Sequence, residues 1–251
     1  MNKRFNITGS CVPDQHYMVD ITERLEKIKE MIDRGDYFVI NRGRQYGKTT
    51  TLKALNNYLA DSYYVVSMDF QRQMSTAKFK DEYSFSVAFI KAFIASLKRN
   101  KCSEQLLSAI NKLEEIIIDN LDLVDLFVNL SEFCGSAEKP VVLMIDEVDQ
   151  ASNNQVFLDF LAQLRGYYLD RFDSPTFKAV ILAGVYDIRN LKLKIRDDSN
   201  HKHNSPWNIA VDFNVDMSLT TNGISGILTD YERDHNTGMD IDDISQLIYD
   251  Y

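Results

Sequence analysis

Apolar residues recur along this chain with two alternating periods, one typical of helices and the other of buried strands. In residues 20–34 they return every three or four positions, which predicts a helix with one apolar face. The next apolar run, YFVIN at 37–41, is short and uninterrupted, as in a buried strand. Further strands are predicted at 63–70, 140–147, 177–184 and 208–217, and further helices at 49–62, 84–98, within 103–133, at 154–172 and after residue 220.

Strands that are apolar throughout and separated by helices indicate an α/β fold, in which helices cover both faces of a parallel sheet. In such folds ligands bind beyond the carboxyl ends of the strands. The strand at 37–41 ends in Asn41, and the strand at 140–147 carries Asp146 near its end. We therefore expect both residues at the ligand-binding edge of the sheet.

The same pattern divides the chain into three parts. Residues 1–35 form an N-terminal arm and a first helix, residues 36–218 form the core, and residues 219–251 begin a helical lid. The last residues, ISQLIYDY, continue an apolar helical pattern without a capping residue. The lid is therefore expected to be incomplete, as in a domain cut short.

Composition narrows the range of partners. The chain has 251 residues with 45% hydrophobic and 26% charged, enough apolar material for a full core, and its formal net charge is −9. That charge repels phosphates and argues against broad binding to nucleic acid or to an anionic membrane. The three cysteines show no CxxC spacing, so neither a disulfide framework nor a zinc site is predicted. With no apolar run of membrane-spanning length, we expect a cytoplasmic protein without a membrane partner.

The stretch RGRQYGKTT follows the strand at 37–41 and precedes a helix, which is the setting of a phosphate-binding P-loop. Gly47 would let the backbone approach the phosphates, Lys48 would reach the β and γ phosphates, and the Thr49 hydroxyl would bind Mg²⁺. A chance GKT in a surface loop is the alternative, and the strand before it and the helix after it argue against chance. The expected nucleotide-binding residues are Arg44, Gln45, Tyr46, Gly47, Lys48, Thr49 and Thr50.

A second motif, VVLMIDEVD, completes the site about one hundred residues later. An apolar strand that ends in Asp146 is typical of a Walker B strand, whose aspartate helps to hold Mg²⁺. Glu147 would act as the general base that activates water, so Lys48 and Glu147 are the candidate catalytic residues and Thr49 and Asp146 the candidate metal ligands. Alternatively, Asp146, Glu147 and Asp149 only form the solvated first turn of a helix, because acidic residues favour helix N-termini. The two motifs occurring in this order favour a nucleotide site.

Four stretches together resemble the bacterial AAA-like ATPase domain family: RFNITGSCVPDQHYMVD, INRGRQYGKTTTL, VLMIDEVDQ and SPWNIAVDFNVDM. The resemblance covers almost the whole chain. It implies a three-layer αβα sandwich with a five-stranded parallel sheet in the order 5-1-4-3-2, a helical lid, and ATP with Mg²⁺ as ligands. P-loops commonly have a glycine five residues before Gly47, where this chain has Arg42. Loops of this family often read R-x-R-[QR]-[FY]-G-K-[ST], so the loop with Arg42 resembles a variant that the family uses. Whether Arg42 and Arg44 face the phosphates or shape the turn stays open.

The resemblance also suggests further site residues. Relatives carry a polar sensor of the γ-phosphate at the end of the fourth strand, where this chain has Gly184 and Val185, so Tyr186 or Asp187 is the alternative. Related oligomeric ATPases place an arginine finger near Arg165 and Arg171, which can equally be ordinary surface residues.

Two other segments have two interpretations each. Before the first helix, Val12, Pro13, His16 and Tyr17 can stack on adenine, or they can simply pack the arm. The basic loop at 189–203 can bind nucleic acid or an acidic protein, or be only solvated; nucleic acid is not favoured in so acidic a chain.

Three functions follow from these residues. The first is a Mg²⁺-dependent ATPase whose hydrolysis drives a conformational change, with a homo-oligomer or a protein partner possible. The second is a nucleotide-dependent switch or scaffold that hydrolyses slowly or not at all. The third is a DNA-associated ATPase, which depends on the loop at 189–203. ATP is expected over GTP by resemblance, and no NKxD-type guanine motif occurs.

Overall fold

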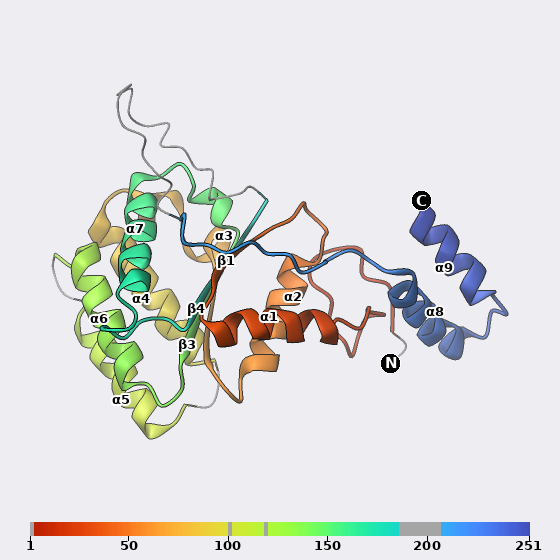
Figure 1. Ribbon diagram of the computed structural model, residues 1–251, viewed down its shortest axis with the longest axis horizontal. Helices are drawn as coiled ribbons and strands as arrows, with labels where there is room; N and C mark the ends of the chain where they lie inside the picture. Colours follow the sequence, from red (N-terminus) through yellow and green to blue (C-terminus); the bar gives the residue numbers. More distant parts are fainter. Residues whose placement is uncertain (1–2, 100–101, 118–119, 186–206) are drawn as a thin grey trace.

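A four-stranded parallel sheet lies at the centre of the molecule, with helices on both of its faces (Figure 1). The computed structural model describes residues 3–99, 102–117, 120–185 and 207–251. The elements in chain order are α1 Thr22–Arg34, β1 Tyr37–Asn41, α2 Lys48–Leu59, β2 Tyr64–Asp69, α3 Phe70–Gln73, η1 Thr76–Phe79, α4 Glu82–Leu97, α5 Glu104–Glu115, α6 Leu123–Ser136, β3 Val141–Asp146, η2 Val148–Gln150, α7 Gln155–Leu169, β4 Ala179–Gly184, α8 Thr221–His235 and α9 Ile241–Asp250.

The sheet has the strand order β1-β4-β3-β2, and all of its pairs are parallel. Every residue of β3 and β4 is buried, as their uninterrupted apolar runs predict for central strands. The first four predicted strands and the α/β class are therefore confirmed. Because all four strands run the same way, their carboxyl ends share one edge, and this edge carries Asn41 and Asp146.

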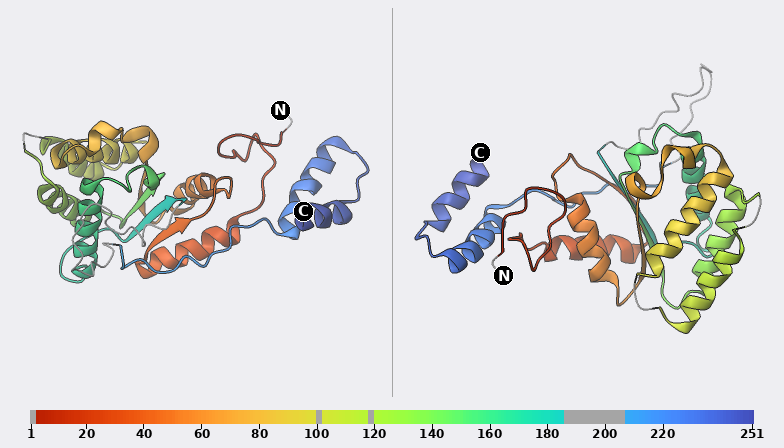
Figure 2. Two further views of the ribbon diagram at one scale, coloured as in Figure 1. Left: turned by 90° about the horizontal axis from the view of Figure 1, so that it is seen from above. Right: turned by 180° about the vertical axis from the view of Figure 1, so that it is seen from behind.

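Each face of the sheet is covered by its own set of helices (Figure 2). Alternate strand residues such as Phe38, Ile40 and Met144 pack with α1 and α2 on one face. The other alternate residues, such as Val39, Leu143 and Leu182, pack with α4, α5, α6 and α7 on the opposite face. This arrangement gives the three layers that the resemblance implied.

The expected fifth strand is wrong. Residues 208–217 run beside β1, but their only pairing with the described sheet is the single bridge between Phe38 and Val211. Beyond this bridge, arginine side chains bind the carbonyl groups of the segment in place of a strand. Arg42 donates to the carbonyl oxygen of Phe213 (3.4 Å), and Arg24 donates to that of Asp216 (3.2 Å). Within the described residues the sheet therefore has four strands, and the order 5-1-4-3-2 is replaced by β1-β4-β3-β2.

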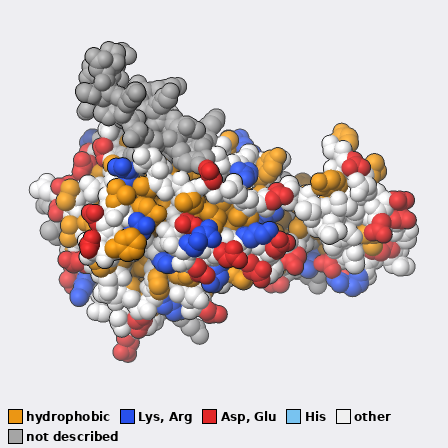
Figure 3. Space-filling model, viewed as in Figure 1, with side chains coloured by type: hydrophobic (Ala, Val, Ile, Leu, Met, Phe, Trp, Pro, Cys, Tyr) orange, Lys and Arg blue, Asp and Glu red, His pale blue; other side chains and the backbone are white. Residues whose placement is uncertain are grey.

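Helices α8 and α9 form a hairpin that stands apart from the sheet (Figures 1 and 3). The N-terminal arm reaches this hairpin: the rings of Phe5 and Tyr17 lie 5.4 Å from that of Tyr231 on α8. The Tyr17 hydroxyl donates a hydrogen bond to Asp234 at 2.8 Å. Burial, followed by that contact with Asp234, raises the pKa of Tyr17 to about 12. The arm thus ties the start of the chain to α8.

No helix in the described ranges is long and apolar enough to cross a membrane.

The largest apolar cluster is built on phenylalanine, and Phe160 of α7 lies at its centre. Its ring is completely buried and lies 5.0 Å from that of Phe89 and 5.3 Å from that of Phe127. Phe160→Ala is expected to lower the free energy of unfolding by about 3–5 kcal/mol, because it leaves a cavity that its neighbours cannot fill. Urea unfolding followed by circular dichroism measures this loss.

Phe172→Ala is the matched control, because that ring is 86% exposed, and it should cost less than about 1 kcal/mol. Equal losses in the two variants would contradict this account of the core.

Candidate functional site

The candidate site begins where the chain passes from β1 into α2. Residues 42–47 form the connecting loop, and Gly47 takes the left-handed conformation (φ 73°) that glycine adopts without strain. Helix α2 starts directly after it, with no side chain capping its first N–H groups. Those groups and the helix dipole favour an anion at this position. Gly47 therefore leaves the N-terminus of α2 open to a phosphate.

Lys48 is a buried cation at this N-terminus. Its side chain is only 7% exposed, and its Nζ donates hydrogen bonds to the carbonyl oxygens of Arg42 (2.7 Å) and Gly43 (2.9 Å). A buried charge is normally balanced by an opposite charge, and these two partners are neutral. Phosphate oxygens would supply stronger, charge-assisted hydrogen bonds.

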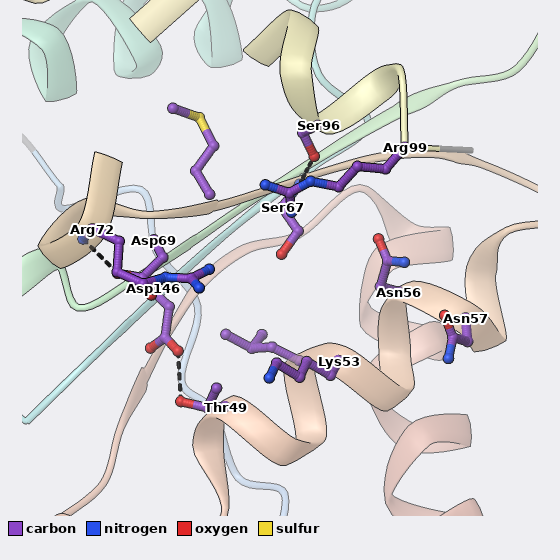
Figure 4. A pocket seen from close by; sticks show the side chains of 12 residues that line it. Thr49, Lys53, Asn56, Asn57, Ser67, Asp69, Arg72, Ser96, Arg99 and Asp146 are labelled. Carbon is purple, nitrogen blue, oxygen red and sulfur yellow. Dashed lines mark hydrogen bonds and ion pairs between the residues drawn. The ribbon is translucent and has the colours of Figure 1, made fainter. Parts of the chain in front are cut away.

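The two motifs meet in one hydrogen bond (Figure 4). The Thr49 hydroxyl donates to Asp146 Oδ2 at 2.7 Å, although the residues are 97 positions apart in the chain. Asp146 ends β3 and is 7% exposed. A hydroxyl and a carboxylate in contact are the oxygen ligands that Mg²⁺ takes at such sites. The donor set of Thr49 and Asp146 therefore fits this cation.

Glu147 directly follows Asp146 and is held in an unusual conformation. Its φ of 56° lies in the left-handed region, which costs a residue with a side chain about 1–2 kcal/mol. Its N–H donates to Asp146 Oδ1 at 3.0 Å. Partial burial and the charge of Asp146 raise the pKa of Glu147, while Lys48 opposes this rise. Strain and a raised carboxylate pKa are both typical of functional positions.

Asp69 is a site residue that the sequence reasoning missed. It ends β2 and lies opposite Asp146 in the β2–β3 register, and its carboxylate pairs with Arg72 at 2.7 Å. The sequence could have indicated Asp69, because the apolar run YVVSMD ends in aspartate just as VVLMID does. Asp69 and Asp146 border a hollow of about 320 Å³ that is shared with the candidate site (Figure 4). The hollow is lined by Thr49, Leu52, Lys53, Asn56, Asn57, Ser67, Met68, Asp69, Arg72, Ser96, Arg99 and Asp146.

Arg42 has a structural role in the loop. Its guanidinium donates to the carbonyl oxygens of Asn41 (3.1 Å) and Phe213 (3.4 Å) and lies 5.6 Å from the centre of the Phe213 ring. Arg42 therefore ties the loop to the segment that follows residue 207.

The other expected binding residues of the loop face outward or toward the arm. Arg44, Gln45 and Tyr46 are exposed, and Gln45 is left-handed (φ 69°). The Thr50 hydroxyl accepts a hydrogen bond from the Cys11 N–H at 3.1 Å. Thr50 therefore joins α2 to the N-terminal arm, and its role toward a nucleotide stays a prediction.

The candidate arginine fingers lie away from this edge. Arg165 donates to Asn208 at 2.8 Å, and Arg171 lies 4.1 Å from the ring centre of Tyr168. Arg171 borders a hollow with Val141 and Lys178, near the amino ends of β3 and β4. This is the edge of the sheet opposite Asp146, so Arg171 is not part of the site within its own chain. The role of either arginine as a finger toward a neighbouring copy stays a prediction.

Three predictions concern other parts of the chain. Tyr17 packs against Tyr231 of α8 and donates to Asp234, as described above. Tyr186 and Asp187 lie outside the described residues, and so does the loop at 189–203. The roles predicted for these residues stay predictions.

Comparison with known proteins gives little further information. No family model matches the chain and no curated protein is similar to it, so the resemblance to the bacterial AAA-like family stays a prediction. Among solved structures, the chain is similar to the Orc1 protein of Aeropyrum pernix, solved in complex with DNA, with a TM-score of 0.47 and 11% identity. The similarity covers 86% of this chain and 50% of that one, so the chain spans half the length of that protein. At this level it establishes no shared function or partner.

Glu147→Gln is expected to raise the Tm of the protein without nucleotide or Mg²⁺ by about 2 °C at pH 7. Burial and Asp146 raise the pKa of Glu147, so its ionised form is disfavoured in the folded state. This penalty is absent when Glu147 is protonated in both states, grows as the pH rises above the ordinary glutamate pKa of 4.5, and is complete above the raised folded pKa. Thermal unfolding by circular dichroism should therefore show the gain shrinking as the pH is lowered to about 4.

Glu26→Gln, at an exposed position of α1, should leave the Tm unchanged at both pH values. A Glu147→Gln protein with the wild-type Tm throughout this range would contradict the proposed environment of Glu147.

Proposed function

We propose that this protein binds ATP together with Mg²⁺ and hydrolyses it. The observation that carries the proposal is the 2.7 Å contact between Thr49 and Asp146, beside the buried Lys48 and the N-terminus of α2. A phosphate chain needs an open helix N-terminus, a cation and a metal-binding oxygen pair close together. Here three separate features of the chain supply these at one edge of the sheet.

On binding of ATP, Lys48 would exchange its hydrogen-bond partners. Its Nζ now binds the carbonyl oxygens of Arg42 and Gly43, and it would turn from these neutral groups to the β and γ phosphates. The uncapped N–H groups at the start of α2 would bind phosphate oxygens at the same time. Thr49 and Asp146 would hold Mg²⁺, which when bound offsets charge on the phosphates.

Glu147 would be the general base for hydrolysis. It would take a proton from water as the water oxygen bonds to the γ-phosphorus, while the bond from that phosphorus to the β–γ bridging oxygen breaks and ADP leaves. Its raised pKa suits this task, because a base with a pKa nearer to neutrality accepts a proton more readily. Its position directly after Asp146 places it beside the proposed metal ligands.

The arm offers a route from the site to the C-terminal hairpin. Cys11 donates to Thr50 on α2 (3.1 Å), and Tyr17, six residues further on, donates to Asp234 on α8 (2.8 Å). A shift of α2 on nucleotide binding or hydrolysis would therefore be transmitted to α8 through residues 11–17, which are hydrogen-bonded to both helices. This link supports a function in which ATP turnover moves the hairpin relative to the core.

A second function, a switch that holds ATP and hydrolyses it slowly, shares the same binding residues. One observation favours it: β4 ends at Gly184 and is followed by Val185, and neither residue has a polar side chain that could sense the γ-phosphate. The two functions differ in turnover alone, and the choice of ATP over GTP rests on the resemblance.

Lys48→Ala is expected to weaken binding of Mg²⁺-ATP by about 100-fold or more, because it removes the buried cation next to the phosphates. Isothermal titration calorimetry with ATP and with GTP measures this, and the wild type should prefer ATP. Lys91→Ala, an exposed lysine of α4, is the control and should bind as the wild type does. Equal affinities of wild type and Lys48→Ala would remove the central part of the proposal.

Glu147→Gln is expected to bind ATP normally but to release phosphate about 100-fold more slowly than the wild type, because it loses the general base. Steady-state phosphate release under saturating Mg²⁺-ATP checks this. If the wild type binds ATP and yet releases no more phosphate than Glu147→Gln, the switch replaces the ATPase as the proposed function.

A further inference from the structure

The carboxylate of Asp149 lies where a sensor side chain was expected, at the carboxyl end of β4. Asp149 belongs to η2, the short turn that follows Glu147, and its Oδ2 accepts a hydrogen bond from the Val185 N–H at 2.6 Å. The two residues are 36 positions apart in the chain. This contact therefore joins the turn after β3 to the end of the neighbouring strand.

The sheet itself leaves room for this contact. The β3–β4 ladder runs from Val142 and Ala179 to Ile145 and Leu182, and the chain after β3 then turns away into η2. Beyond this point β4 has no backbone of β3 beside it. The Asp149 carboxylate takes over as an acceptor for the N–H that follows β4.

Gly184 is explained by the same contact. A Cβ atom at Gly184 would lie 2.8 Å from Asp149 Oδ1 and 2.9 Å from Oδ2, closer than real Cβ contacts. Gly184 does not have a positive φ, so the glycine is required for space and not for its backbone conformation. The residue type that seemed to abolish a sensor here is the one that admits the Asp149 side chain.

The turn that Asp149 anchors is the one that carries Glu147. Glu147 is left-handed, and such a conformation persists only where its surroundings hold it. Val148 and Ala151 of the turn are completely buried, and the Ser152 hydroxyl donates to the Asp149 carbonyl oxygen at 2.7 Å. Asp149 is thus fixed at its backbone and, through its side chain, fixes the turn to β4.

We propose that Asp149 is a positioning residue for Glu147: by accepting the Val185 N–H it holds the turn after β3 against the end of β4 and so sets the place of the general base. This inference rests on the proposed ATPase function and deepens it. Asp149 acts through Glu147 and not on the nucleotide. Its loss should therefore reduce kcat while leaving the affinity for ATP nearly unchanged.

The test compares Asp149→Ala, Asp149→Asn and Gly184→Ala with the wild-type chain of 251 residues. Asp149→Ala should lower kcat for ATP hydrolysis about 10-fold or more and change KM less than about threefold. Asp149→Asn keeps an oxygen that can accept the Val185 N–H and should recover most of kcat. Gly184→Ala should lower kcat as Asp149→Ala does, because its methyl group displaces the carboxylate.

Asp173→Asn, an exposed aspartate after α7, is the control and should match the wild type. A kcat for Asp149→Ala within twofold of the wild type would overturn the proposal. So would equal losses in kcat and in ATP affinity, since these indicate a general structural role.

Amide hydrogen exchange by NMR keeps the two proposals separable. The Val185 amide should be protected in the wild type and in Asp149→Asn, and should exchange faster in Asp149→Ala. If the wild type releases no phosphate, the ATPase function fails, and exchange at Val185 still decides whether Asp149 holds the turn. Equal exchange in wild type and Asp149→Ala would show that it does not.

Discussion

The parallel pairing of β1, β4 and β3 is the constraint on which the candidate site depends. Lys48 follows β1 and Asp146 ends β3, so they share an edge only because both strands pair in parallel with β4 between them. The Thr49–Asp146 hydrogen bond is the direct result of that register. The fully buried central strands β3 and β4 give this edge a close-packed base, on which the side chains of the two motifs meet.

At this edge of the sheet, Lys48 and Glu147 are both held in unfavourable environments or conformations by their neighbours. Lys48 is buried on neutral carbonyl oxygens, and Glu147 is left-handed beside a second carboxylate. Such features cost stability and are retained where they serve a function. A bound phosphate would give the buried Lys48 a partner of opposite charge. The left-handed conformation of Glu147 places a carboxylate of raised pKa next to the proposed metal ligands, which is where hydrolysis needs a base.

Much of the fold and of the site could be predicted because the relevant signals are local. Uninterrupted apolar runs predicted four strands, and the structure has all four. The GKT and DE sequences singled out Lys48, Thr49, Asp146 and Glu147, which the structure places at one edge of the sheet, while their roles toward a nucleotide stay predictions. The errors came from contacts between distant residues. The predicted fifth strand does have an alternating pattern, but Arg42 and Arg24 bind the carbonyl oxygens of Phe213 and Asp216 from 171 and 192 positions away. No periodicity in the sequence reports such a contact, and none reports the Asp149 carboxylate beside Gly184.

A crystal structure of the Glu147→Gln protein with ATP and Mg²⁺ tests the central claim most directly. The account predicts the triphosphate at the N-terminus of α2, the cation between Thr49 and Asp146, and Lys48 Nζ moved from its carbonyl partners to phosphate oxygens. Nucleotide bound elsewhere, or Lys48 still on the carbonyl oxygens of Arg42 and Gly43 beside a bound triphosphate, would contradict it.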